Sequence, residues 1–312
     1  MNKIVITGGA GFIGSHLADA CCQLPQKPEV IVLDNLRTGR RANLDRNQHH
    51  LNFSWIEGSI CDAELVEQVC TGADWIFHLA AMISVPESLI RPLECVDLNV
   101  RGTINVLEAA RKHRVKKVVL SSSAAIYGDE PELPKHELMR PAPQTPYGIT
   151  KLDGEYYLEM YRKNYGISTV SLRYFNVYGP HQDPNSQYAA AVPAFIQRAI
   201  TGQPIQIFGD GQQTRDFVYV GDVAAANLWV ASHSDLHGIY NVATGTTVTI
   251  LQLAESIRGL LNSSSPIQHQ EPRPGDIRAS WSDPGKLMAT GFKPSYDLTS
   301  GLRPTLAAAR QD

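Results

Sequence analysis

The chain is poor in cysteine, in long apolar runs and in excess charge. Its five cysteines, among 312 residues, form no C-x-x-C pair and no Cys/His cluster with the spacing of a zinc site, so we expect buried, reduced thiols without a bound metal. No apolar run reaches transmembrane length, and the N-terminus "MNKIVITGG" enters a strand without the layout of a signal peptide. The formal net charge of -3 gives no reason to expect nucleic acid or membrane as a partner. These absences favour a cytoplasmic protein.

Apolar, β-branched runs alternate with helical patterns in the first half of the chain. The runs "KIVITG", "EVIVLDN", "NFSWIEG", "WIFHLAA" and "KVVLSSS" are typical of strands in a parallel sheet that is covered on both faces. Between them, helical spacing predicts helices over Phe12–Leu24, Ala63–Cys70 and Leu93–His113. A βαβ series of this kind predicts an α/β fold with a doubly wound parallel (Rossmann) sheet.

The regular alternation of strand and helix patterns ends in the second half of the chain. A helix is expected from Pro146 to about Asn164, followed by the strand "STVSLRYFNVYG", a polar loop "GPHQDPNSQ" and strands such as "IQIFGD" and "GIYNVATG". We predict a Rossmann domain of residues 1–173 plus about 214–243. The remaining stretches, about 174–213 plus 244–312, are expected to form a smaller α/β substrate lobe.

A glycine-rich turn comes after the first strand. "ITGGAGFIGSH" places Gly8, Gly11 and Gly14 between a strand and a helix, where glycine allows a tight turn and lets the backbone approach a pyrophosphate at the helix N-terminus. The second strand ends at Asp34, whose carboxylate can accept hydrogen bonds from a ribose. The combination predicts dinucleotide binding and favours NAD, although Arg37, Arg40 and Arg41 leave NADP open as an alternative.

Tyr147 and Lys151 stand four residues apart in "TPYGITK", so both project from one face of a helix. A neighbouring ammonium favours the phenolate, which would make Tyr147 a proton acceptor. The fifth strand ends in Ser121, Ser122 and Ser123, and the ends of parallel strands form the ligand crevice of such a sheet. One serine can hold a substrate oxygen while Tyr147 takes its proton and the nicotinamide takes a hydride.

Many motifs in order carry a resemblance over nearly the whole chain. They are "TGGAGFIGSHL", "LDNL", "HLAA", "DLNVRGTINVLEAA", "SSSAAIYG", "PYGITK", "RYFNVYGP", "GDGQQTRDFVYVGDVA" and "FKPSYDLTSGLRPT". On these the chain resembles the extended short-chain dehydrogenase/reductase family, specifically its NAD-dependent nucleotide-sugar epimerases and dehydratases. The resemblance implies that Tyr147 is the acid/base, that Lys151 binds the nicotinamide ribose and lowers the tyrosine pKa, and that Ser123 bonds the reacting hydroxyl.

The resemblance also implies two sets of binding residues. The set expected at NAD, besides Gly8, Gly11, Gly14, Asp34, Tyr147 and Lys151, comprises Phe12, Ile13, Asn35, Leu36, Thr38, Gly39, Ser59, Ile60, Leu79, Ala80, Ala81, Ile83, Asn99, Ser121, Ser122, Phe175 and Val177. The set expected at a UDP-sugar, besides Ser123, comprises Ser84, Asn176, Ala191, Val192, Gln206, Phe208, Arg215, Arg273, Asp276 and Ser280. One departure is visible, because Ser59 comes after Gly58 where family members often have an aspartate.

The two residues directly after the serines narrow the chemistry. The 4,6-dehydratases of this family carry an Asp–Glu pair there, whereas this chain has Ala124 and Ala125. Without that second acid the resemblance implies oxidation and re-reduction of one carbinol, which is epimerisation at C4 with NAD regenerated in each turnover. The small Ser280 and the stretch "YAAAVP" favour UDP-GlcNAc/UDP-GalNAc, with or without UDP-Glc/UDP-Gal.

Three alternatives stay open. A UDP-glucuronate 4-epimerase could use Arg278 for the carboxylate, a reductase could exchange NADPH, and a silent protein could merely bind NAD. The resemblance further implies a homodimer, with the helices at Leu93–His113 and Pro146–Asn164 forming a four-helix bundle between two subunits.

Overall fold

The computed structural model describes residues 1–183, 190–272 and 277–310, and these divide into two compact units. The first unit comprises Met1–Glu130, Glu137–Tyr174 and Val223–Tyr240. The second unit comprises Pro131–His136, Phe175–Asp222 and Asn241–Asp312. The sequence-based bounds placed residues 131–136 and 214–222 with the Rossmann sheet, whereas here both stretches belong to the second unit.

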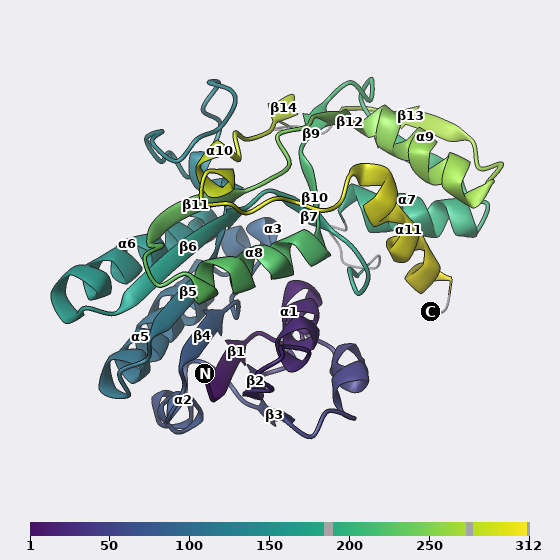
Figure 1. Cartoon of the computed structure of the whole chain (residues 1–312). Helices are drawn as coiled ribbons and strands as arrows, with labels where there is room; N and C mark the ends of the chain where they lie inside the picture. Colours follow the sequence, from purple (N-terminus) through teal and green to yellow (C-terminus); the bar gives the residue numbers. More distant parts are fainter. Residues whose placement is uncertain (184–189, 273–276, 311–312) are drawn as a thin grey trace. The chain divides into compact units, whose positions relative to one another are not determined.

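A seven-stranded sheet organises the first unit (Figure 1). Its order is β11 (Gly238–Val242), β6 (Ser168–Tyr174), β5 (Lys117–Ser123), β4 (Trp75–His78), β1 (Lys3–Thr7), β2 (Glu29–Asp34) and β3 (Phe53–Glu57). The pairings from β6 through to β3 are all parallel. This is the doubly wound α/β fold that the sequence predicted, and the carboxyl ends of its strands carry Asp34, His78 and Ser123 along one edge.

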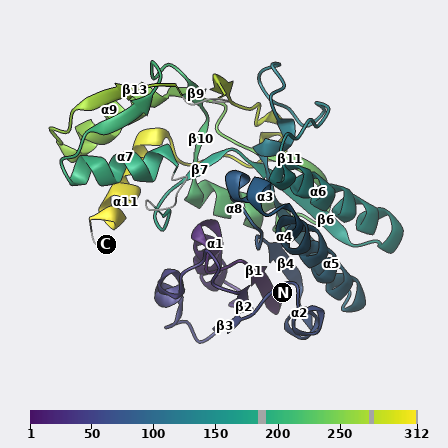
Figure 2. The same ribbon diagram turned by 180° about the vertical axis from the view of Figure 1, so that it is seen from behind.

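Helices cover both faces of this sheet. The helices of the first half are α1 (Phe12–Cys22), α2 (Ala63–Cys70), α3 (Val85–Ile90), α4 (Pro92–Val96), α5 (Gly102–Lys112) and α6 (Pro146–Tyr165). α2, α5 and α6 pack their apolar sides on one face, where Val66, Val106, Leu107 and Leu158 join the buried core. Figure 2 shows α5 and α6 on this face, and Figure 1 shows α1 and α8 (Val220–Ser232) on the other.

Two expected elements are interrupted. The helix predicted over Leu93–His113 is divided by a π-helical segment, Asp97–Arg101, between α4 and α5. Such a π-bulge is common at functional sites, and this one contains Asn99. The strand predicted over "STVSLRYFNVYG" breaks at Phe175 into β6 and β7 (Asn176–Tyr178), which belong to different sheets. The break is where the chain leaves the first unit.

Small sheets and helices form the second unit. β7 pairs with β10 (Phe217–Tyr219), β8 (Ile205–Phe208) with β13 (Ile267–Gln270), and β9 (Thr214–Arg215) with both β12 (Val248–Thr249) and β14 (Ala279–Ser280). The helices are α7 (Ala191–Ile200), α9 (Ile250–Leu261), α10 (Gly285–Met288) and α11 (Leu298–Ala309). Short 3₁₀ or π segments of the described chain lie at Arg41–Asn47, Asp97–Arg101 and Ala124–Tyr127. Among the described helices, none combines the length and apolar character that a membrane span requires.

Candidate active site

The glycine turn between β1 and α1 is tightly constrained. Gly8 adopts φ +73, and a Cβ there would stand 2.6 Å from the backbone nitrogen of Ala80. A Cβ on Gly14 would stand 2.2 Å from the carbonyl oxygen of Gly8. Gly11 is the N-cap of α1 and, in the described residues, no side chain caps the helix N-terminus. The backbone N–H groups of the first turn are therefore the donors that this turn offers, which fits the binding of a diphosphate.

Asp34 lies at the end of β2, beside this turn. Its Oδ2 accepts a hydrogen bond from the Ala10 N–H at 2.9 Å, and its Oδ1 accepts one from the Leu36 N–H at 2.8 Å. Burial raises the pKa of Asp34, and these two backbone donors oppose the effect. Each carboxylate oxygen retains a lone pair, so the group can still accept hydrogen bonds from ribose hydroxyls as the sequence predicted. Gly39 packs against it, since a Cβ there would stand 2.9 Å from Oδ1.

The arginines that could have favoured NADP have other partners. Arg37 forms ion pairs with Glu87 and with Glu94, the former at 2.8 Å. The guanidinium of Arg41 lies 5.5 Å from the ring centroid of Trp55. A 2′-phosphate beside Asp34 would have to compete with two carboxylates for Arg37, which weighs against NADP.

The other residues predicted to bind NAD from the first unit are arranged around the sheet edge. Ser59 stands at the position of the missing aspartate and accepts the Cys61 N–H at 3.1 Å, while Ile60 is buried against Gly102. Leu79 and Ala80 donate to the carbonyl and the hydroxyl of Thr7, respectively. The remaining members lie half-buried or exposed in this region: Phe12, Ile13, Asn35, Thr38, Ala81 and Ile83. Their contacts with NAD stay predictions.

The three consecutive serines at the end of β5 all contact α6. The Ser123 hydroxyl hydrogen-bonds Tyr147, the Ser121 carbonyl accepts from the Lys151 Nζ at 2.7 Å, and the Ser122 hydroxyl donates to Glu155 at 2.6 Å. The helix residues are spaced four apart, so one face of α6 meets three successive positions of the strand. The predicted triad of Ser123, Tyr147 and Lys151 is therefore brought together. Ser122 already has a partner, and its contact with NAD stays a prediction.

Burial controls the charges of this triad. It lowers the pKa of Lys151 to about 8, against the opposing influence of Cys95 and Glu155. It raises the pKa of Tyr147, and the hydrogen bond with Ser123 lowers it by less than burial raises it. We expected Lys151 to lower the tyrosine pKa. In this structure burial is the larger effect and the tyrosine pKa lies above its ordinary value, while the lowering by Lys151 stays a prediction.

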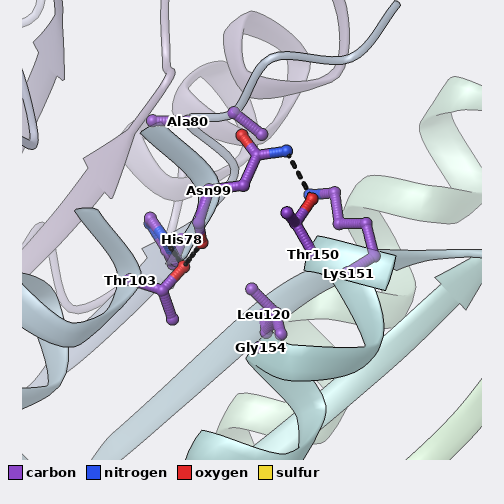
Figure 3. Close-up of a pocket in the computed structure, with 9 residues that line it drawn as sticks. His78, Ala80, Asn99, Thr103, Leu120, Thr150, Lys151 and Gly154 are labelled. Atoms are coloured by element: carbon purple, nitrogen blue, oxygen red, sulfur yellow. Dashed lines mark hydrogen bonds between the residues drawn. The ribbon is translucent and has the colours of Figure 1, made fainter. Parts of the chain in front are cut away.

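A small cavity lies beside Lys151, and a hydrogen-bond network forms its wall (Figure 3). Thr103 donates to the carbonyl of Asn99 at 2.5 Å, so its oxygen accepts from His78 Nε2 at 2.9 Å. His78 Nδ1 is then the acceptor for the Thr7 hydroxyl at 2.7 Å. Both nitrogens of the neutral imidazole therefore have a hydrogen-bond partner, and burial lowers the pKa of His78 to about 3. Sequence reasoning treated this histidine only as part of "HLAA" and missed its structural role.

Asn99, whose contact with NAD stays a prediction, is buried and hydrogen-bonded on both atoms of its amide. Its Oδ1 accepts the Met82 N–H at 2.7 Å, and its Nδ2 donates to the Met82 carbonyl at 3.1 Å and to the Thr150 hydroxyl at 3.0 Å. The side chain thus joins the segment after β4 to α6, as Figure 3 shows for the contact with Thr150. Thr150, which sequence reasoning did not select, in turn donates to the carbonyl of Tyr147 at 3.0 Å.

The second unit brings two predicted substrate residues together. Arg215 in β9 and Ser280 in β14 are register partners. Asn176 donates to the carbonyl of Asp216, the residue that follows Arg215, at 2.9 Å. Asp216 is buried and accepts hydrogen bonds from the Thr244 N–H, the Thr244 hydroxyl and the Gly245 N–H. Sequence reasoning missed Asp216, although "TRDF" contained it. Its hydrogen bonds tie the residue after Arg215 to Thr244 and Gly245.

Other predicted binding residues are distributed over the two units. In the first, Ser84 caps α3 by accepting the Glu87 N–H at 3.2 Å. In the second, Val192 is buried in α7, and Gln206 and Phe208 pair in register with β13. Arg273 and Asp276 lie outside the described residues. Phe175 and Val177, which are expected at NAD, lie just before β7 and within β7, respectively. Ala191 is the first residue of α7.

Comparison with known proteins decides the family. Residues 4–243 match the model of the NAD dependent epimerase/dehydratase family. The chain belongs to this family. It is 36% identical to a UDP-glucose 4-epimerase of Mycolicibacterium smegmatis, over 97% of each chain. Solved structures are similar over nearly the full length as well.

Two of these structures are informative. A UDP-N-acetylglucosamine 4-epimerase of Methanobrevibacter ruminantium, in complex with UDP-N-acetylmuramic acid, has a TM-score of 0.95 and 40% identity, covering 99% of this chain and 98% of that one. A UDP-glucose 4-epimerase of Thermus thermophilus, in complex with NAD, has a TM-score of 0.88 and 38% identity over 99% of both chains. NAD is the cofactor of this epimerase/dehydratase, and the glycine turn and Asp34 fit it.

Proposed function

We propose that the chain is a UDP-hexose 4-epimerase that oxidises C4 to a transient 4-keto sugar and returns the hydride to the opposite face. One observation carries this assignment. Ser123 hydrogen-bonds Tyr147, the Lys151 Nζ lies 5.9 Å from the centroid of the Tyr147 ring, and the two positions directly after Ser123 are Ala124 and Ala125, which supports acid–base chemistry without a second acid. Bound NAD supplies the hydride acceptor and donor, and the chain supplies acid–base chemistry at a single hydroxyl.

The residues of the triad have separable roles. Ser123 and Tyr147 share a hydrogen bond, so a sugar hydroxyl seated at both would be oriented for proton removal by the tyrosine oxygen. Lys151, anchored on the Ser121 carbonyl at 2.7 Å, places an ammonium beside that tyrosine. Its positive charge favours the phenolate as the sugar hydroxyl is deprotonated, and it favours proton return when the 4-keto group is reduced.

Methyl groups after Ser123 limit the reaction. Elimination of water from a hexose needs a second acid or base next to the catalytic hydroxyl. Ala124 and Ala125 begin the 3₁₀ turn at that point, and Ser123 Oγ accepts the Ala125 N–H at 3.1 Å. A methyl side chain can neither donate nor accept a proton. This supports epimerisation over 4,6-dehydration within the family.

The substrate we propose is UDP-GlcNAc, interconverted with UDP-GalNAc, with or without UDP-Glc and UDP-Gal. Ser280 supports this, since it is a small, half-buried residue aligned with Arg215, which could contact the diphosphate bidentately. The similarity to the M. ruminantium UDP-N-acetylglucosamine 4-epimerase supports it as well. For UDP-glucuronate, Arg278 would have to give up Asp210, to which it is already bound bidentately at 2.7 and 2.9 Å.

The experiment is an assay of purified protein without added reductant, in which UDP-GlcNAc and UDP-Glc are followed separately by NMR of the anomeric protons. Conversion of UDP-GlcNAc to its C4 epimer is the expected result. Conversion of UDP-Glc alone would keep the mechanism and reject the substrate. Retained, stoichiometric NAD released by denaturation would separate an epimerase from a reductase that exchanges NADPH. Retained NAD with no conversion of any UDP-hexose would indicate a silent binding protein.

We also propose a homodimer formed by the helices that flank the sheet edge. Leu93 in α4 is 81% exposed, and Ile149 and Tyr156 in α6 are 48% and 61% exposed. α4 and α6 pack together, so these side chains belong to adjoining surfaces of the first unit. Sedimentation velocity should give twice the chain mass of 34.3 kDa, and Leu93→Glu should return the monomer.

A further inference from the structure

A buried ion pair lies behind the serines at the end of β5. Glu155 in α6 and Arg173 in β6 form two hydrogen bonds, Nε to Oε1 at 2.8 Å and Nη2 to Oε2 at 2.7 Å, and both side chains are 1% exposed. Glu155 Oε1 also accepts the Ser122 hydroxyl at 2.6 Å. The carboxylate stands four residues after Lys151, on the same face of the helix. The triad therefore has a carboxylate as a neighbour, one helical turn after Lys151.

We propose that Glu155, held in place by Arg173, is a positioning residue that keeps Lys151 charged and fixes the serine end of β5 against α6. This rests on the proposed function, because the reaction gives the charge of Lys151 its use. Among the described residues Glu155 hydrogen-bonds Ser122 and Arg173, and it acts on the triad through Lys151 and Ser122.

The other groups around Lys151 leave this task to Glu155. From α4, Cys95 is a neutral thiol, because burial raises its pKa. From β4, His78 is a neutral imidazole committed to two threonines. Tyr147 on α6 is neutral until it takes part in proton transfer, and from β5 the uncharged Ser121 carbonyl accepts the Lys151 Nζ. Glu155 is the carboxylate that opposes the burial of the Lys151 ammonium, whose pKa is about 8.

Arg173 holds the Glu155 carboxylate in place in the core. A bidentate pair of this kind is a strong, charge-assisted contact that fixes the orientation of the carboxylate. Burial alone would lower the pKa of Arg173, and its bonds to Glu155 raise it instead. The guanidinium carbon lies 4.8 Å from the ring centroid of Tyr127, which closes the 3₁₀ turn begun by Ala124. The ion pair is thus packed between α6, β6 and the 3₁₀ turn at Ala124–Tyr127.

The test compares the pH profile of kcat across variants. Glu155→Gln retains an acceptor for Ser122 but removes the negative charge and leaves Arg173 positive. The alkaline limb, set by deprotonation of Lys151, is expected to move about 1 pH unit lower. The double variant Glu155→Gln with Arg173→Met removes both charges, and its limb should lie between those of Glu155→Gln and the wild type. Ser122→Ala breaks the same strand contact without changing charge, so its limb should coincide with that of the wild type.

A second readout does not depend on turnover. The titration of Lys151 is followed by ¹³C NMR of lysine ε-carbons, with the resonance assigned by Lys151→Met, and the midpoints should follow the same order. A wild type that epimerises no UDP-hexose would defeat the proposed function while leaving this titration to decide the inference. If the midpoint of the Lys151 titration and the alkaline limb of kcat stay unchanged in all variants, and only the thermal stability falls, the pair of Glu155 and Arg173 is purely structural. If Glu155→Gln does not fold, the double variant is compared with Ser122→Ala instead.

Discussion

His78 Nε2 donates a hydrogen bond to Thr103 Oγ1 at 2.9 Å, which links the end of β4 to the π-helical segment that carries Asn99. Because Thr103 donates onward to the Asn99 carbonyl and Thr7 donates to Nδ1, the imidazole has no site left for a second proton. The network holds the segment that contains Asn99 beside Lys151 and depends on a neutral histidine.

This neutrality predicts an acid-sensitive fold. The pKa of His78 is about 3 in the folded chain against 6.5 ordinarily, so below pH 6.5 the unfolded state binds a proton that the folded state does not. Stability is therefore lost as pH falls through this window. When the pH is lowered from 6.5 to 5, the free energy of unfolding measured in urea should fall by about 1.5 kcal/mol more for the wild type than for His78→Gln. His49→Gln, at an exposed position, should match the wild type. Parallel pH dependences for wild type and His78→Gln would contradict this assignment.

Removal of the tyrosine hydroxyl should abolish the chemistry and spare the cofactor. Tyr147→Phe deletes the group that shares a hydrogen bond with Ser123, so turnover should fall by roughly 10²- to 10⁴-fold. NAD released by denaturation should remain at the wild-type level. The matched control is Tyr165→Phe, at the end of the same helix and 51% exposed, which should keep turnover. Near-normal turnover of Tyr147→Phe would take Tyr147 out of the central role.

Asp34 should determine the choice of cofactor together with the partners of Arg37. Asp34→Ala strips an acceptor from the Ala10 and Leu36 N–H groups, so stability should fall by about 1–3 kcal/mol and the Kd for NAD should rise at least about tenfold. The affinity for NADP should not increase, because Arg37 stays bound to Glu87 and Glu94.

Freeing that arginine provides the matching experiment. Adding Glu87→Gln and Glu94→Gln to Asp34→Ala leaves Arg37 without its carboxylates, and titration calorimetry should then detect tighter NADP binding than in Asp34→Ala alone. Equal NADP binding in the two proteins would show that the ion pairs do not govern this discrimination.

The sequence was sufficient for those features that depend on local pattern. The alternation of apolar runs predicted the parallel sheet, and the four-residue spacing of Tyr147 and Lys151 predicted their common face. It could not predict the division of the helix at Asp97–Arg101, because the π-helical segment is held by groups distant in sequence, here the Met82 backbone and the Thr150 hydroxyl, which hydrogen-bond the Asn99 side chain.

The same limit applies to the charges of the site. Pairing Lys151 with Tyr147 suggested a lowered tyrosine pKa, whereas the structure adds burial, which acts in the opposite direction on the phenol. The bond between Glu155 and Arg173 joins residues 18 positions apart through the packing of α6 on β6, and neither residue type announced it. Sequence pattern thus suggested the reacting groups but not the contacts that set their protonation.

Ser280 should decide whether an N-acetyl group is accepted. It is half-buried and aligned with Arg215. We propose that it faces the C2 substituent of the sugar, so that a large side chain there would block an N-acetyl group. Ser280→Tyr should lower kcat/KM for UDP-GlcNAc at least about tenfold, in line with the loss expected from a steric clash of more than about 1.4 kcal/mol, while kcat/KM for UDP-Glc changes by only a few-fold. Ser280→Ala, which keeps the space, should retain both activities. Equal losses for the two substrates in Ser280→Tyr would mean that the residue supports the strand pair of β9 and β14 and does not select the sugar.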